Sequence, residues 1–111
     1  MTAYAVAHLR NVRMGSGIVA YLEAIDATLA PFGGHYIIHG GKPAVLEGNW
    51  QGDLVVLAFP NRRSAEDWYA SEAYRRIQHF RTDNADGEVI IVDGVDRGHR
   101  GADILSGLVA G

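Results

Sequence analysis

Two apolar runs constrain what this chain can fold into, one at residues 54–59 and one at 89–92. The first is rich in β-branched residues and lies between Gly52 and Pro60, a pattern typical of a strand buried on both faces. The second run, Val-Ile-Ile-Val, has the same character. A sheet that contains such strands must be covered on both faces, and few small folds provide this.

The residues after Pro60 predict two helical segments separated by a short break. Asn61 is a suitable N-cap for the first segment. Ser71 is a suitable cap for the second, which we expect to run from Glu72 to about Asp83. The residues at helical spacing on the two segments are Ala65, Trp68 and Tyr69, followed by Ala73, Ile77 and Phe80.

The remaining elements follow in a regular order. We expect a strand over 4–12, a glycine turn, a helix over 18–32 capped by Ser16, a short strand over 35–39, and a turn over 48–52 that leads into the first apolar run. The order β-α-β-β-α-β predicts an α+β, ferredoxin-like fold. Its four-stranded antiparallel sheet would carry helices on one face.

Two helices cover only one face of such a sheet, because four strands at ~4.8 Å are about as wide as two helices of ~10 Å. The other face would expose a large apolar patch on a monomer. We therefore expect a homodimer whose two sheets pack face to face as a dimeric α/β barrel. The domain is predicted over 1–96. The tail, 97–111, is expected to form a short helix that docks on the partner subunit or over a pocket.

Several segments of the chain resemble the family known as domain of unknown function 1330. The segments that carry the resemblance are 33–41, Leu46-Glu47-Gly48 with Trp50, Phe59-Pro60, Trp68-Tyr69 with Ser71 and Tyr74, Arg81, and Val92-Asp93-Gly94. The resemblance covers about residues 3 to 94. It implies a dimeric α/β-barrel fold and no established activity.

Composition excludes several classes of function. The formal charge is −3 and the ten Lys and Arg are scattered, whereas nucleic-acid binding needs a concentrated basic face. The chain has no cysteine, which excludes disulfides and thiolate metal sites and fits a cytoplasmic location. No apolar run approaches the ~18 residues that a membrane-spanning helix needs.

One motif between the first strand and the first helix is typical of dinucleotide binding. Residues 15–20 match the pattern G-x-G-x-x-A. The next strand, which ends near His39, lacks the acidic residue that would hold a ribose, and the chain is too short for a doubly wound fold. A plain turn is the better interpretation, and we expect no cofactor.

His39 and Glu47 are the candidate catalytic residues. His35 and His39 are expected on one face of a short strand. They could exchange protons or hold a metal with Glu47 or His79 as a third ligand, although exposed polar side chains are the simpler interpretation and no metal is expected. Glu47 would become a usable base only inside a cavity, where desolvation raises its pKa.

Five residues are candidates for ligand binding. Helical spacing alone explains most of the aromatic ones as core or interface residues. The arginine lies late in its helix, where complementing the helix dipole is the preferred interpretation and pairing with a carboxylate ligand is the alternative. The five are Trp50, Trp68, Tyr69, Tyr74 and Arg81.

Three functions agree with these patterns. The first is binding of a small organic molecule in a pocket between sheet and helices. The second is a cofactor-free enzyme, similar to isomerases or monooxygenases built on dimeric α/β barrels, in which His39 and Glu47 transfer protons. The third is a non-catalytic accessory role. The sequence does not decide whether the protein is an enzyme, and it names no substrate.

Overall fold

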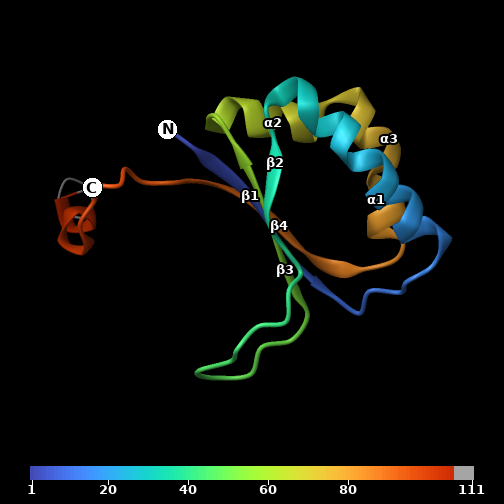
Figure 1. The fold of residues 1–111 in the computed structure, drawn as a ribbon, viewed down its shortest axis with the longest axis horizontal. Helices are drawn as coiled ribbons and strands as arrows, with labels where there is room; N and C mark the ends of the chain where they lie inside the picture. Colours follow the sequence, from blue (N-terminus) through green and yellow to red (C-terminus); the bar gives the residue numbers. More distant parts are fainter. Residues whose placement is uncertain (107–111) are drawn as a thin grey trace.

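The protein is a four-stranded sheet with three helices packed against one of its faces (Figure 1). The computed structural model describes residues 1–106, so the last five residues of the predicted tail lie outside the described part. The elements are β1 (Ala3–Arg10), α1 (Ser16–Leu29), β2 (His35–His39), β3 (Asp53–Phe59), α2 (Arg62–Ala70), α3 (Glu72–Thr82) and β4 (Asp86–Asp93), with short 3₁₀ turns at Ala30–Phe32 and Gly101–Asp103.

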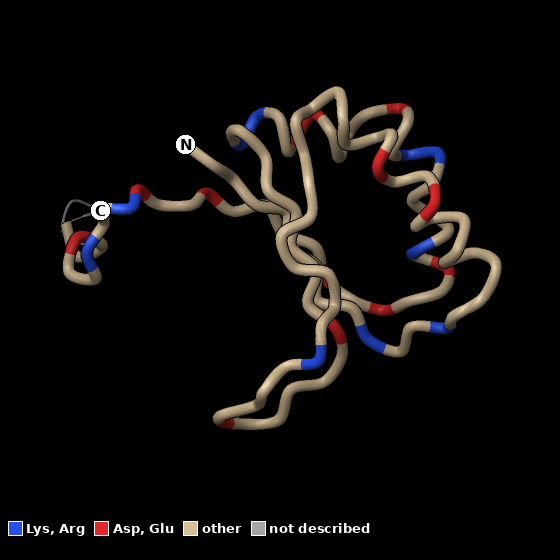
Figure 2. Tube along the Cα trace, viewed as in Figure 1, with Lys and Arg blue, Asp and Glu red and all other residues tan. Residues whose placement is uncertain are grey.

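The strands lie in the order β2-β3-β1-β4, and every neighbouring pair is antiparallel. Together with the element order, this confirms the predicted ferredoxin-like α+β fold. The two central strands are therefore β3 and β1, which explains why the run at 54–59 is apolar throughout. Figure 2 shows that Lys, Arg, Asp and Glu lie mainly on helices, turns and strand ends, while the middle of the sheet carries almost none.

Local capping signals place the two helices that follow β3. Asn61 accepts a hydrogen bond from the backbone N–H of Ser64 at 2.8 Å, and Ser71 accepts one from that of Tyr74 at 3.2 Å. Both caps were predicted and both are confirmed. The cap predicted for α1 is wrong, because Ser16 is already inside the helix and Gly15 precedes it without any side-chain cap.

The hydrophobic core lies between the sheet and the helices. Its most deeply buried large side chains are Tyr74, Phe59 and Leu29, each less than 2% exposed. On α3 the buried face differs from the one predicted, because Ala73 is exposed and the neighbouring Tyr74 points inward instead. The other two predicted residues, Ile77 and Phe80, pack against the core as expected, so the buried face is only shifted towards Tyr74 and Arg81.

A register shift interrupts β2 between Tyr36 and Ile38. Tyr36 pairs with Leu57 and His39 pairs with Val55, on the face that the helices cover. The one extra residue reverses the alternation of side chains, so residues two apart in the sequence no longer share a face.

None of the three helices packs on the other face of the sheet, where Trp50 stacks on His8 near the end of β1. The exposed apolar side chains of this face include Ile38, Ile90 and Val92, which are 42%, 56% and 43% exposed. After β4 the chain runs to the side of the sheet away from the helices (Figure 1). There it carries three more exposed apolar residues, Val95, Ile104 and Leu105.

The connection between β2 and β3 is a long loop over 40–52 without secondary structure, and not the tight turn at 48–52 that we expected. It extends beyond the end of the sheet (Figure 1). Within residues 1–106 no helix is both long and apolar enough to cross a membrane.

Candidate ligand-binding site

A cavity of about 260 Å³ lies between the helix-covered face of the sheet and the three helices. The strands contribute mainly small or aliphatic side chains to its wall, together with Tyr36, His39 and Asp53. The helices contribute aliphatic side chains, three aromatic ones and one arginine. The wall includes Ala5, Ala7 and Leu57 from the strands and Tyr21, Trp68, Tyr74 and Arg81 from the helices.

The cavity exists because β1 presents small side chains to the helices. Ala5 and Ala7 point toward α1 and α3, while their strand neighbours Leu57 and Val55 are larger. Helices pack ~10 Å from a sheet when medium-sized side chains fill the space between them. Two alanines in the central strand leave part of that space unfilled.

A polar cluster is set into this apolar wall. The hydroxyl oxygens of Tyr21 and Tyr74 lie 2.8 Å apart, and Nη2 of Arg81 donates to the Tyr74 oxygen at 3.5 Å. Tyr74 and Arg81 lie seven residues apart, two turns along α3, and therefore share a face of that helix. Tyr21 reaches them from α1, so the cluster joins two helices over the cavity.

Burial sets the protonation of this cluster. Burial, aided by the neighbouring Tyr74, raises the pKa of the Tyr21 phenol above its ordinary value, so Tyr21 stays protonated. Burial alone would lower the pKa of Arg81, but the oxygens of Tyr74 and Tyr21 outweigh it and raise that pKa. The cavity wall therefore contains a cation beside the protonated hydroxyl of Tyr21.

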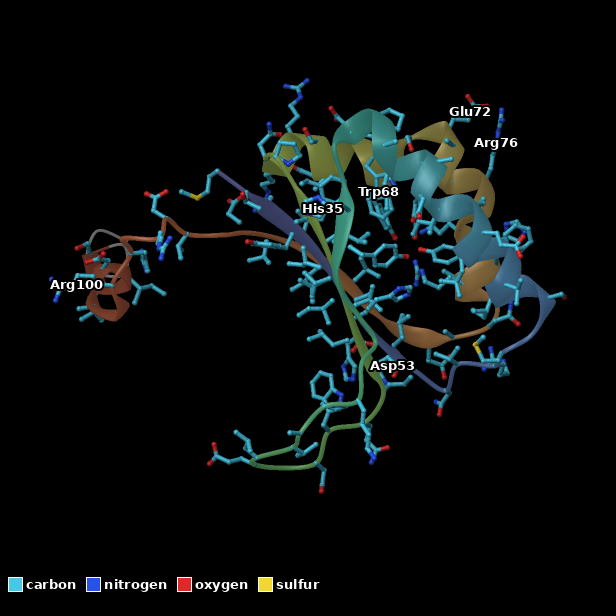
Figure 3. All side chains as sticks on the ribbon, in the orientation of Figure 1. His35, Asp53, Trp68, Glu72, Arg76 and Arg100 are labelled. Atoms are coloured by element: carbon cyan, nitrogen blue, oxygen red, sulfur yellow. The ribbon has the colours of Figure 1, made fainter. Side chains whose placement is uncertain are left out.

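Trp68 closes the cavity from the side of α2, and its side chain points from the helix toward the sheet (Figure 3). Its indole Nε1–H donates to Thr28 Oγ1 at 3.0 Å, and its ring lies 4.2 Å from that of Tyr74. Phe59 packs on its other side at 5.4 Å. Trp68 is thus fixed in orientation before any ligand arrives.

His39 lies at the end of the cavity near the 40–52 loop. Its ring stacks on that of Tyr36 with centroids 4.2 Å apart, and Asp53 also lines this end. Burial, followed by the nearby Asp26 and Tyr74, raises the pKa of Tyr36 to about 12. The cavity wall therefore includes a histidine beside the 40–52 loop as well as the tyrosine–arginine cluster.

Four of the seven predicted site residues line this cavity, namely His39, Trp68, Tyr74 and Arg81. The other three lie elsewhere. Glu47 is exposed in the 40–52 loop. Trp50 stacks on His8 at 4.5 Å and donates from Nε1 to the Gly52 carbonyl at 3.0 Å. Tyr69 accepts a hydrogen bond from Gln78 at 2.8 Å outside the lining.

The expectation that His35 and His39 share a face is wrong. His35 pairs with Ala58 and His39 pairs with Val55, three residues apart on β3, so their side chains point to opposite faces. The register shift described above is the cause. Within residues 1–106, no three His, Asp or Glu side chains lie close enough together to hold a metal ion.

Two aromatic residues of the cavity wall, both tyrosines, were not predicted from the sequence. Tyr21 lies among the apolar residues that mark one face of α1, and this spacing predicts a core residue. Tyr36 lies in the short strand between the two histidines, and the register shift turns it inward. A tyrosine on an otherwise apolar helix face is a signal in itself, because its hydroxyl needs a partner when buried.

The fold and this site define a ferredoxin-like α+β domain with a cavity beneath its helices. The chain belongs to the family described as Domain of unknown function (DUF1330), whose model matches residues 2–95. No curated protein matches the chain in sequence.

Solved structures with the same fold come from several organisms. A protein of unknown function from Rhodopseudomonas palustris is 14% identical over 86% of this chain and 83% of its own, with a TM-score of 0.63. A dimeric ferredoxin-like protein of unknown function from Jannaschia sp. CCS1 is 8% identical over 85% of this chain and 100% of its own, with a TM-score of 0.59. A hypothetical Arabidopsis thaliana protein is 10% identical over 88% and 90%, with a TM-score of 0.56. At these identities the likeness establishes the fold alone.

Proposed function

We propose that this protein binds a small organic molecule in the cavity between its sheet and its helices. The observation that carries the proposal is the cavity itself, about 260 Å³ in volume and walled mostly by apolar side chains, with one polar cluster set into it. Small-molecule sites commonly combine an apolar wall with a few placed polar groups. At about 30 Å³ for a water-sized group, the space suits a molecule of roughly nine such groups.

The test uses benzamide, an uncharged probe of suitable size, and follows backbone amide NMR signals during titration. We expect the largest shifts at Ala5, Ala7 and Leu57. Ala7→Leu would fill the cavity and abolish binding. Val6→Leu is the matched control, because it adds bulk to the same strand on the other face. Binding that survives Ala7→Leu, or wild-type protein that gives no shifts, would contradict the proposal.

Native mass spectrometry of freshly purified protein offers a second route that needs no probe. A ligand retained from the host would add a discrete mass to the protein. Its loss in the Ala7→Leu variant, with retention in Val6→Leu, would place it in the cavity.

We further propose that a second copy of the chain covers the open face of the sheet. Three observations support a second copy over other partners: the exposed Ile38, Ile90 and Val92, the tail that runs to the same side with more apolar residues, and the dimeric state of the Jannaschia protein of similar fold. Apolar patches of this kind mark association sites.

Sedimentation at micromolar concentration tests this second proposal. We expect a dimer for the wild type and a monomer for Ile90→Lys, because a charge would be buried in the interface. Val19→Lys is the matched control, since Val19 is also exposed and β-branched but lies on α1, away from the open face. A wild-type monomer, or a dimer that survives Ile90→Lys, would contradict it.

Proton transfer is the second candidate function, and the observation that favours it is the place of His39 in the cavity wall. A histidine beside a bound molecule is a plausible acid or base near neutral pH. Glu47, the predicted partner, would have to act from an exposed loop. For any substrate that is found, His39→Ala should lower turnover by ~100-fold or more, and Glu47→Gln tests the partner. Turnover that survives both changes would contradict this function.

A further inference from the structure

Arg81 is a buried cation that has no carboxylate partner among residues 1–106. Its side chain is 8% exposed, yet none of the salt bridges within residues 1–106 involves it. A charge removed from water is costly unless an opposite charge compensates it. Asp53 also lines the cavity, but it forms no ion pair with Arg81.

Part of the guanidinium faces the cavity. Nη2 donates to the hydroxyl of Tyr74, and the hydroxyl of Tyr21 also interacts with the guanidinium. No fully buried side-chain nitrogen or oxygen among residues 1–106 lacks a partner. Since Arg81 lines the cavity, its guanidinium can donate to a molecule bound there.

The two phenols add one more donor. Tyr21 and Tyr74 carry two hydroxyl hydrogens between them, and one of these lies in the 2.8 Å bond that joins their oxygens. The other has no acceptor among residues 1–106, because Arg81 can only donate. The cluster thus presents several donors and a positive charge to the cavity.

We propose that the ligand is an organic monocarboxylate whose carboxylate binds Arg81 and the Tyr21–Tyr74 pair while its apolar body lies against Ala5, Ala7 and Leu57. This proposal rests on the function proposed above. A guanidinium binds a carboxylate through two parallel hydrogen bonds, and a phenol can add a third. The small volume and the single cation favour a carboxylate over a phosphate ester, which needs more donors.

The experiment compares benzoate with benzamide, which have nearly the same shape and differ in charge. We expect benzoate to bind the wild type roughly tenfold to hundredfold more tightly, the usual value of a hydrogen bond to a charged group. Arg81→Met should remove this preference while leaving benzamide affinity within a few-fold. Raising the ionic strength should change benzoate binding little, because buried pairs are weakly screened.

The outcomes separate this inference from the proposed function. If benzamide binds and benzoate binds no more tightly, the carboxylate inference is overturned and the cavity remains a binding site. If neither compound binds the wild type, both proposals fall. If Arg81→Met does not fold, Tyr21→Phe replaces it. That change removes one donor and should weaken benzoate several-fold and benzamide less, because a hydrogen bond to a charged oxygen is stronger than one to an amide oxygen. Equal weakening of both would count against the inference.

Discussion

The two faces of this sheet have similar strands and opposite surroundings. On the face that the helices cover, Phe59 and Trp68 are almost fully buried. On the open face, Ile90 and Val92 are about half exposed. Both faces are rich in apolar residues, so apolar character alone does not say which face a single chain covers. The number and width of the helices decide that.

The alternation along β1 shows how the faces differ in bulk. Ala3, Ala5 and Ala7 point to the helices, whereas Tyr4 and Val6 point the other way. β1 therefore carries small side chains on the covered face and larger ones on the open face. The covered face gains a cavity from this arrangement, and the open face gains a surface with larger apolar side chains.

The largest predicted effect would follow from removing a ring from the covered face. Phe59→Ala should lower the free energy of unfolding by about 3–5 kcal/mol, because it leaves a cavity beside Trp68 and Leu29. Val92→Ala on the open face should change it by no more than roughly 0.5 kcal/mol in dilute protein. Urea unfolding measures both. Equal losses for the two variants would remove the distinction between the faces.

A smaller effect is expected at Gly34, where the backbone packs directly against core side chains. A Cβ on Gly34 would lie 2.6 Å from a ring carbon of Phe59 and 2.9 Å from Leu29, so Gly34→Ala should cost about 1–3 kcal/mol. At Gly41 a Cβ would meet nothing within 4 Å, and Gly41→Ala should leave stability unchanged or raise it by up to about 1 kcal/mol. Thermal unfolding of the pair is the measurement, and a loss at Gly41 that matched the one at Gly34 would argue against the packing described.

The smallest effect is a loss of folding stability at high pH, which we attribute to Tyr36 on the covered face. Burial raises the pKa of Tyr36 from 10.0 to about 12, so the folded state holds this proton more tightly than the unfolded state. The resulting stability is fully present below pH 10 and is lost as the pH rises to about 12. Denaturant midpoints across this range should fall less steeply in Tyr36→Phe than in the wild type. An unchanged slope would show that Tyr36 is not buried as described.

Local signals in the sequence predicted most of the fold. Pro60 ends β3, Asn61 and Ser71 cap the helices that follow, and the apolar run at 54–59 is a central strand. Each of these features depends on residues close together in the chain. That is why a single sequence was sufficient to place them, and why the element order followed.

The site was predicted less completely, because it depends on orientation. One extra residue between Tyr36 and Ile38 reverses the side chains of β2, and nothing in that apolar stretch marks the shift. Arg81 lies in the last turn of α3, as a helix-dipole role requires, yet its guanidinium is buried against Tyr74. That contact depends on how α1 and α3 pack, which periodicity does not reveal.

The alanines of β1 also affect how the size of the cavity could change among related domains. Substitutions at Ala5 or Ala7 would change the length and breadth of the molecule that fits, without touching Arg81 or Tyr21. Substitutions at Arg81 would change the charge of the cavity wall. In the proposed site, selectivity for size and selectivity for charge would therefore depend mainly on different elements, β1 and α3, and related sequences could change one property with little change in the other.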